Sequence, residues 1–251
     1  MQDWLARAYG HSPRQHDYSL TVAVRVVNWA VNARKLRQHH LSDLDRLYEV
    51  DRADIVWTPA WREQFNAVAP RWIQRILDVA CETGLRPSEL CRLSRQHVQE
   101  TPEGWRIRIR TDKRRRIAVP PVTEGLQALL DEIPRDRLLV LVGGRGQPLT
   151  AQAASKAVAR WRDKAGLTEE AIGVSLRLQD ARGTAATRFL EAGLTLNQIA
   201  AVMGWSLRHA AAVIEHYAAA TVDESDTIRR RVEAHDGART GTKSVNGGVN
   251  R

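Results

Sequence analysis

The chain has 251 residues, of which 43% are hydrophobic and 27% charged, a composition that supports a buried core and excludes wholesale disorder. Lysine and arginine number 38 against 29 aspartate and glutamate residues, and the net charge of +9 favours a polyanionic partner. No apolar run approaches the roughly 20 residues that cross a bilayer, and Cys81 and Cys91 are too few for a disulfide framework or a zinc site, so we expect a soluble, cytoplasmic, cofactor-poor protein.

The first predicted element is an amphipathic helix within residues 19–40. Apolar residues recur at helical spacing from Leu20 to Val31. Basic residues lie between or after them, among them Arg34 and Lys35, and predict a basic face on this helix.

A second region begins where Thr58 and Pro59 read as a helix N-cap followed by proline at the first helical position. We therefore place a boundary near residues 50–58 and expect helical structure from there to about residue 97. Gly84 and Pro87 punctuate that pattern, and Pro87 suits the first turn of a new helix.

Residues 105–119 change to a period of two, because Trp105, Ile107 and Ile109 alternate with arginines. The pattern predicts a β-hairpin with one apolar and one basic face. Its basic tip suits a DNA groove and its backbone, although a solvated edge strand that uses charge against aggregation has the same pattern. The predicted DNA-contacting residues are Arg108, Arg110, Arg114, Arg115 and Arg116, together with Arg34 and Lys35.

The rest of the chain is predicted to be helical at 122–131 and 150–165, through a block at 179–217 that is broken at Gly193 and Gly204, and at 223–234. Residues 236–251 are predicted to be a disordered tail. The predicted fold class is mainly α with a small antiparallel β-sheet (α+β).

Arg86 is the first residue suited to phosphate chemistry. It follows Gly84 at a predicted helix start, where backbone N–H groups and a guanidinium together favour an anion, and Glu89 lies one turn on to orient it. The alternative is a capped helix with a surface Arg–Glu pair.

Three later positions belong to the helical block. Gln179 and Arg182 lie at the start of one helix, and Trp205 follows the glycine that ends the next. These helices also match a helix-turn-helix DNA reader without catalysis. Tyr217 lies near a helix end, where a tyrosine is ordinarily a packing residue.

In this order, the segments resemble the tyrosine recombinase, or phage integrase, family over about residues 58–235. The resemblance implies an integrase-like catalytic domain at 58–235, preceded at 1–57 by part of a helical core-binding region that clamps DNA and is short for the family. The matching positions in chain order are Arg86, Glu89, Lys113, Gln179, Arg182, Trp205 and Tyr217.

The resemblance also implies a mechanism. Tyr217 attacks a DNA phosphodiester to form a 3′-phosphotyrosyl link, while Arg86 and Arg182 clamp the phosphate oxygens. Lys113 protonates the leaving oxygen, and Trp205 donates a hydrogen bond to the phosphate or packs nearby. No metal, ATP or other cofactor is implied. The implied partners are double-stranded DNA and further copies of the chain in a tetramer, with no membrane.

The match departs from the family pattern at several positions. Gln179 stands where the family has histidine or lysine, and an amide cannot shuttle a proton. Gly183 and Trp205 also stand where histidine is common. Two alternatives therefore remain: a catalytically impaired relative or helix-turn-helix-like DNA-binding regulator, and a type IB-like topoisomerase, which uses the same tyrosine chemistry on one duplex.

Overall fold

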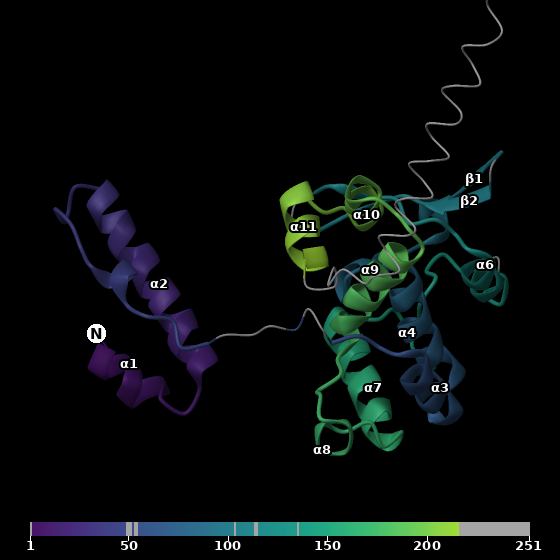
Figure 1. The fold of residues 1–251 in the computed structure, drawn as a ribbon, viewed down its shortest axis with the longest axis horizontal. Coiled ribbons are helices and arrows are strands. Elements are labelled where there is room, and N and C mark those ends of the chain that lie inside the picture. Colours follow the sequence, from purple (N-terminus) through teal and green to yellow (C-terminus); the bar gives the residue numbers. More distant parts are fainter. Residues whose placement is uncertain are drawn as a thin grey trace, which may run out of the picture. The chain divides into compact units, whose positions relative to one another are not determined.

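A computed structural model describes residues 2–48, 52, 55–102, 104–112, 115–134 and 136–215 (Figure 1). The chain divides into two units, Met1–Arg52 and Ala53–Arg251. Within the described residues, no helix has both the length and the apolar character that a membrane crossing requires.

The first unit contains α1 (Gln2–Tyr9), α2 (Pro13–Asn32) and a short 3-10 turn, η1 (Leu41–Asp43). The predicted bounds of 19–40 are wrong for α2, because the Ser12 hydroxyl caps the helix and Pro13 takes its first position. The helix also ends earlier than predicted. Arg34 has a φ of +55°, so Arg34 and Lys35 lie beyond the helix and not on a basic helical face.

The second unit is mainly helical, as predicted. The helices predicted at 122–131 and 150–165 are confirmed, and the block from 179 is broken at Gly193 and Gly204, both of which have positive φ. The predicted helix 223–234 and tail 236–251 lie outside the described residues. The helices are α3 (Pro59–Val68), α4 (Arg71–Thr83), α5 (Pro87–Arg92), α6 (Glu124–Asp131), α7 (Ala151–Lys164), α8 (Glu169–Ile172), α9 (Ala181–Glu191), α10 (Leu196–Met203) and α11 (Leu207–Glu215), with 3-10 turns η2 (Arg95–His97) and η3 (Leu178–Asp180).

Helix α4 is the centre of this unit. Its apolar stripe, which includes Ile73, Ile76 and Leu77, is completely buried, and the helix contacts α6, α7 and α9. Pro70 separates α4 from α3, because a proline at the N-cap starts a new helix. Gly84 ends α4 in the left-handed conformation with a φ of +64°, so the chain turns there towards α5.

The strands form two antiparallel ladders instead of the single hairpin predicted at 105–119. Strand β2 (Gly104–Ile107) pairs with β1 (Val98–Thr101), and β3 (Ile109–Arg110) pairs with β4 (Ile117–Ala118). The predicted two faces are present in part. Ile107 and Ile109 are buried and the arginines that alternate with them are exposed, but Ile117 on the apolar face is 38% exposed.

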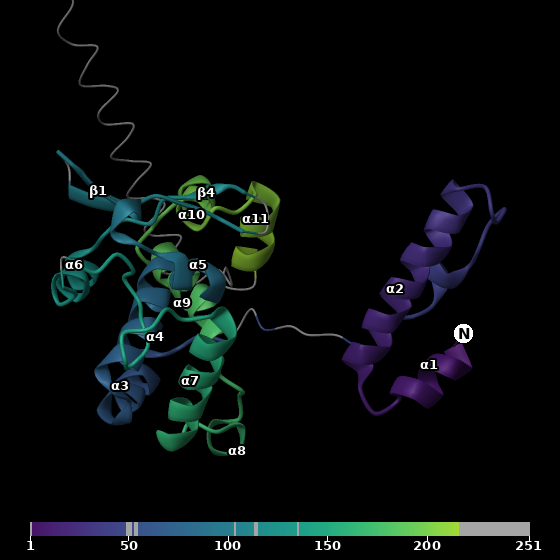
Figure 2. The ribbon, with the colours of Figure 1, turned by 180° about the vertical axis from the view of Figure 1, so that it is seen from behind.

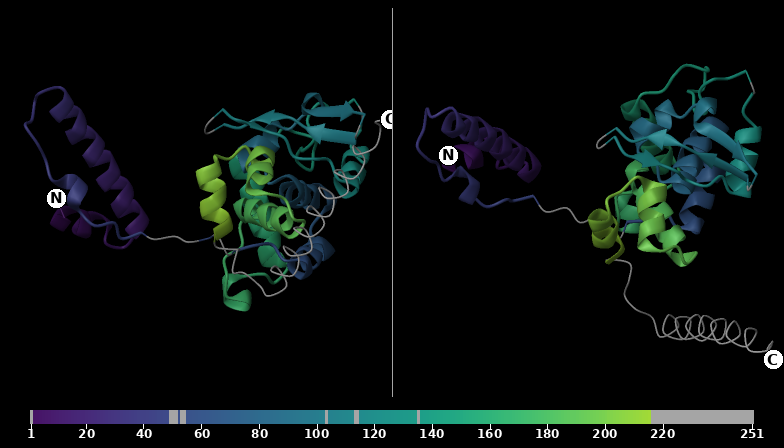
Figure 3. Two further views of the ribbon diagram at one scale, coloured as in Figure 1. Left: turned by 45° about the horizontal axis from the view of Figure 1, so that its top comes forward. Right: turned by 90° about the horizontal axis from the view of Figure 1, so that it is seen from above.

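The strands and the ends of several helices lie at one end of the second unit. Figures 1 and 2 show the strands, α10 and α11 at that end, with α3 and α8 at the other. Helix α10 packs against β4, and Figure 3 (right) gives the view from this end. The Arg182 side chain, in the first turn of α9, bonds to the C-terminal ends of both α4 and α10. Three helix ends therefore meet here.

Candidate active site

Glu89 is the buried centre of the site. Its side chain is completely inaccessible to solvent, and it lies on α5 one turn after Arg86. One carboxylate oxygen accepts the main-chain N–H of Arg86 at 2.9 Å, and the other accepts its guanidinium at 2.9 Å. The Arg86 side chain remains 29% exposed, so its charge is held by Glu89 while one side stays open to a ligand.

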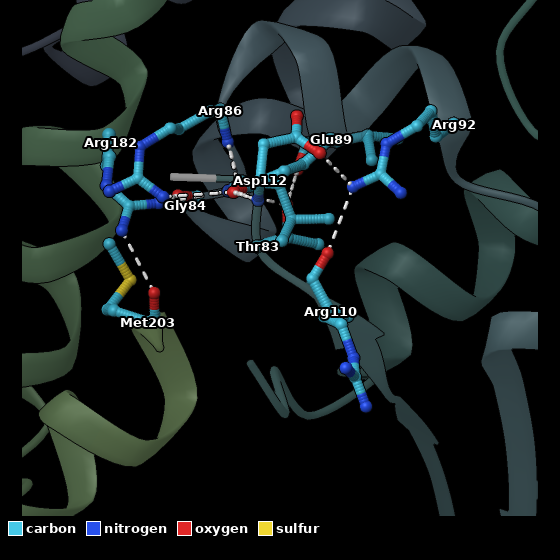
Figure 4. Close-up of polar contacts among 11 residues, drawn as sticks. Thr83, Gly84, Arg86, Glu89, Arg92, Arg110, Asp112, Arg182 and Met203 are labelled. Atoms are coloured by element: carbon cyan, nitrogen blue, oxygen red, sulfur yellow. Dashed lines mark hydrogen bonds and ion pairs between the residues drawn. The ribbon is translucent and has the colours of Figure 1, made fainter. Parts of the chain in front are cut away.

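Arg182, in the first turn of α9, comes to the same place from a distant part of the sequence (Figure 4). Its guanidinium donates to the carbonyl of Gly84 and, at 2.9 Å, to that of Met203, and it lies 3.9 Å from the Glu89 carboxylate. Gly84 and Met203 are at the C-terminal ends of α4 and α10, where carbonyls lack helical partners and the helix dipole favours a cation. Burial, and then the neighbouring charge of Arg86, lower the pKa of Arg182 to about 9.

Trp205 lies directly beside Arg182. The centre of its indole ring is 5.0 Å from the Arg182 guanidinium carbon, and the His209 ring packs edge-on at 4.8 Å. The residue is only 7% exposed. Its indole N–H is buried and has no acceptor among the described residues, so it is an unsatisfied donor on the residue that packs against Arg182.

The β3–β4 hairpin is attached to this cluster through several contacts. The Asp112 main-chain N–H donates to Glu89 at 3.3 Å. Arg92, on α5, donates to the carbonyl of Arg110 at 3.0 Å and forms an ion pair with Asp112 at 2.6 Å. Arg116 donates to the carbonyl of Trp205 at 2.8 Å, so its guanidinium turns towards the protein.

The structure thus brings together Arg86, Glu89, Arg182 and Trp205 of the predicted residues. Gln179 is on η3 and exposed, and within the described residues no hydrogen bond joins its side chain to either arginine. It lines a separate cavity of about 310 Å³ with Lys156, Arg177 and others. Arg34 and Lys35 are exposed in the first unit, and Arg108, Arg110 and Arg115 are exposed in the second. Lys113, Arg114 and Tyr217 lie outside the described residues.

The possible metal ligands of the described residues do not form a cluster. Across the described ranges, no three histidine, cysteine, aspartate or glutamate side chains gather in a group that suits a metal ion. Around the Glu89 carboxylate the described residues place the guanidiniums of Arg86 and Arg182, an arrangement suited to binding an anion.

A comparison with family models decides which family carries this cluster. The model described as "Phage integrase family" matches residues 60–224, well over half of the chain. The chain belongs to the phage integrase family. The resemblance inferred from the sequence is therefore confirmed, as is the tyrosine recombinase catalytic fold.

Solved structures support the same fold for this integrase-family chain. A lambda integrase dimer bound to a COC′ core site has a TM-score of 0.65 and 14% identity over 81% of this chain and 60% of that chain. The Tn1549 transposon integrase in complex with transposon right end DNA has a TM-score of 0.64 and 20% identity over 92% and 84%. A lambda integrase tetramer bound to a Holliday junction has a TM-score of 0.60 and 14% identity over 76% and 58%.

The chain therefore spans 60% of the length of the lambda integrase in the first of these structures. No curated protein matches this integrase-family chain significantly in sequence.

Sequence reasoning missed Arg92 and the inward contact of Arg116. Both residues belong to arginine-rich stretches in which no spacing distinguishes one arginine from its neighbours. The contact of Arg92 with Asp112 joins α5 to the end of β3, and such a pairing emerges only when both elements are in place. The sequence signal for this pairing was Asp112, an acidic residue within an otherwise basic run.

Proposed function

We propose that this phage integrase family member is a site-specific DNA recombinase that cleaves and rejoins DNA through a 3′-phosphotyrosyl intermediate, without metal or ATP. The observation that carries the proposal is the convergence of Arg86 and Arg182 on one buried carboxylate. Two guanidiniums held together without DNA repel each other, and a phosphate placed between them relieves that repulsion.

The arginine pair supports the transition state in this proposal. Charge accumulates on the non-bridging oxygens as phosphorus becomes five-coordinate, and donors already aimed at those oxygens stabilise it more than they stabilise the substrate. The buried indole N–H of Trp205, which has no acceptor in the described residues, is proposed as a third donor, from the segment that follows α10. Glu89 acts by orienting Arg86.

The remaining roles are proposed from the sequence pattern. The Tyr217 oxygen forms the new bond to phosphorus, its proton passes to solvent, and the bond from phosphorus to the 5′ oxygen breaks. Lys113 supplies the proton that the leaving 5′ oxygen takes up. Gln179 transfers no proton, because a carboxamide does not act as an acid or a base at neutral pH. Attack by a free 5′ hydroxyl from another strand reverses the same steps and joins new partners.

We further propose double-stranded DNA and copies of the same chain as partners. The similar solved structures include a dimer on a core site and a tetramer on a Holliday junction, which is the arrangement that exchange between two duplexes requires. The net charge of +9 and the exposed arginines Arg108, Arg110 and Arg115 favour binding along a DNA backbone.

A nicked suicide substrate tests the proposal, because loss of the short 5′ fragment traps the covalent intermediate. We expect wild-type protein to form a covalent adduct with DNA in the presence of EDTA, and Tyr217→Phe to form none. Tyr18→Phe, an exposed tyrosine of the first unit, is the matched control and should form the adduct normally.

DNA binding without any adduct would refute the recombinase and support the DNA-binding regulator. The exposure of Gln179, with no hydrogen bond from its side chain to either arginine among the described residues, is the observation that favours this second candidate. Relaxation of a supercoiled plasmid by the isolated chain, without exchange between two duplexes, would instead support the topoisomerase.

A further inference from the structure

Among the described residues, the hairpin that leads into Lys113 has few main-chain pairs. Strand β3 has two residues, and its ladder to β4 consists of the pairs Ile109–Ala118 and Arg110–Ile117. Thr111 extends it by one hydrogen bond, from its N–H to the carbonyl of Arg116 at 2.7 Å. So short a hairpin is marginal in water, and its position therefore depends on side chains from other elements.

Arg92, the last residue of α5, supplies one anchor for the hairpin. One nitrogen of its guanidinium bonds both to the carbonyl of Arg110, at 3.0 Å, and to the carboxylate of Asp112, at 2.6 Å. One acceptor is in the main chain and the other in a side chain, and together they tie the residues on both sides of Thr111 to α5. Figure 4 shows Arg92 reaching Arg110 and Asp112 from the α5 side.

Glu89, on the same turn of α5, supplies a second anchor at Asp112. Its carboxylate accepts the Asp112 main-chain N–H at 3.3 Å while it holds Arg86. Arg92 and Glu89 lie three residues apart on α5, one turn of the same helix. Asp112 is therefore fixed by its carboxylate and its N–H to one helix, and Lys113 is the next residue in the sequence.

We propose that Arg92 is a positioning residue for DNA cleavage: it fixes the end of β3 to the helix that carries Glu89, and thereby holds the segment that delivers Lys113 to the leaving oxygen. The inference rests on the proposed function and adds to it a residue outside the matching family positions. The Arg92 side chain is 47% exposed, so a direct contact with a DNA phosphate is the rival explanation that the test must separate.

The chemistry of the leaving group separates these explanations. In the ordinary reaction the bond from phosphorus to the 5′ oxygen breaks and that oxygen takes a proton from Lys113. A substrate with sulfur in place of this bridging oxygen leaves as a thiolate, which needs no proton because a thiol has a pKa of about 8.5. A defect in positioning the general acid is therefore repaired by sulfur, whereas a defect in folding or in DNA contact is not.

The experiment measures adduct formation on nicked substrates at saturating DNA. We expect Arg92→Ala to slow cleavage of the oxygen substrate by about ten- to a hundredfold. Cleavage of the sulfur substrate should stay within about fivefold of wild type, the range of an exposed ion pair. Arg71→Ala is the matched control. Arg71 is at the N-terminal end of α4, and its side chain is 45% exposed and paired with Glu132. This variant should cleave both substrates normally.

Lys113→Ala calibrates the sulfur effect and tests the proposed function separately. If wild type forms an adduct and sulfur restores Lys113→Ala, the general acid is established and Arg92→Ala decides the inference. Equal slowing of Arg92→Ala on both substrates, unchanged cleavage of the oxygen substrate, or a loss of DNA affinity that accounts for the slower rate would each overturn it. No adduct from wild type on either substrate would refute the proposed function itself, and the inference with it.

Asp112→Asn adds a test of the pairing. If Arg92 acts through Asp112, the double variant Arg92→Ala with Asp112→Asn should be no slower than Arg92→Ala alone. Losses that multiply would show that the two side chains act independently, which would contradict the proposed anchor.

Discussion

The substitution Glu89→Gln tests whether the buried carboxylate holds the arginine pair. The carboxylate carries two hydrogen bonds from Arg86 and one from Asp112, and Arg182 is 3.9 Å away. Glutamine keeps the shape and one acceptor oxygen but removes the charge and turns an N–H group towards cations. Breaking a buried ion pair costs about 3–5 kcal/mol. Because Arg86 is 29% exposed and keeps some hydration, we expect a loss of about 2–3 kcal/mol in the free energy of unfolding.

Urea unfolding followed by far-UV circular dichroism measures this loss. For an m-value of about 1–3 kcal/mol per molar, the midpoint should fall by about 0.7–3 M. Glu132→Gln is the matched control, because Glu132 also faces two arginines, Arg71 and Arg75, but is 39% exposed. We expect it to lose at most about 1 kcal/mol.

Added sulfate should stabilise Glu89→Gln more than wild type, since the anion replaces the missing charge between the guanidiniums. Equal stability losses for Glu89→Gln and Glu132→Gln, or equal gains from sulfate in wild type and Glu89→Gln, would refute the idea that Glu89 neutralises the arginine pair.

Three further predictions concern the same end of the second unit. Gly84→Ala should lower the free energy of unfolding by about 1–2 kcal/mol, because φ is +64° and the new Cβ would also displace the flexible end of the Met203 side chain; an unchanged thermal midpoint would contradict this. Burial and the charge of Arg86 lower the pKa of Arg182 to about 9, so DNA affinity should fall as pH rises through that value. The contribution of Arg182 to the free energy of unfolding without DNA should rise over the same pH range, because the unfolded chain holds this proton to a higher pH. A DNA affinity independent of pH from about 8 to 10 would contradict the low pKa of Arg182. Burial raises the pKa of Cys81 to about 12, so a thiol reagent should label it only after unfolding, and rapid labelling of the native protein would show that α4 opens there.

The residues that the sequence located well are those with a local signature. Gly84 precedes Arg86, and Gly204 precedes Trp205, and each glycine ends a helix in the left-handed conformation that its lack of a side chain permits. Arg182 opens a helix of its own. These three turns could therefore be predicted from neighbouring residues, even though their meeting in space could not.

Strand β1 shows why the rest could not be predicted. Its residues, Val98–Thr101, have one half-buried side chain at each end and two exposed ones between, so they lack the alternation that marks a strand. The segment is a strand because β2 pairs with it in the register that sets Val98 opposite Ile107. That pairing also took β2 out of the longer hairpin that the alternation around Trp105 predicts.

The partners of Arg182 were likewise invisible in the sequence, because main-chain carbonyls carry no residue identity. Any residue at 84 or 203 offers the same oxygen, and only the ends of α4 and α10 leave it without a helical donor. A motif search finds the arginine and not the two acceptors that hold it.

The attachment of Arg182 to two helix ends has a consequence for the binding of an anion at this site. Neither carbonyl can shift without unwinding the last turn of its helix, so the guanidinium is preorganised by the secondary structure itself. A long side chain that must be immobilised on binding costs about 0.5–1.5 kcal/mol, and here that cost falls on folding instead. Under the proposed function, an incoming phosphodiester would therefore meet a cation that is already fixed in place.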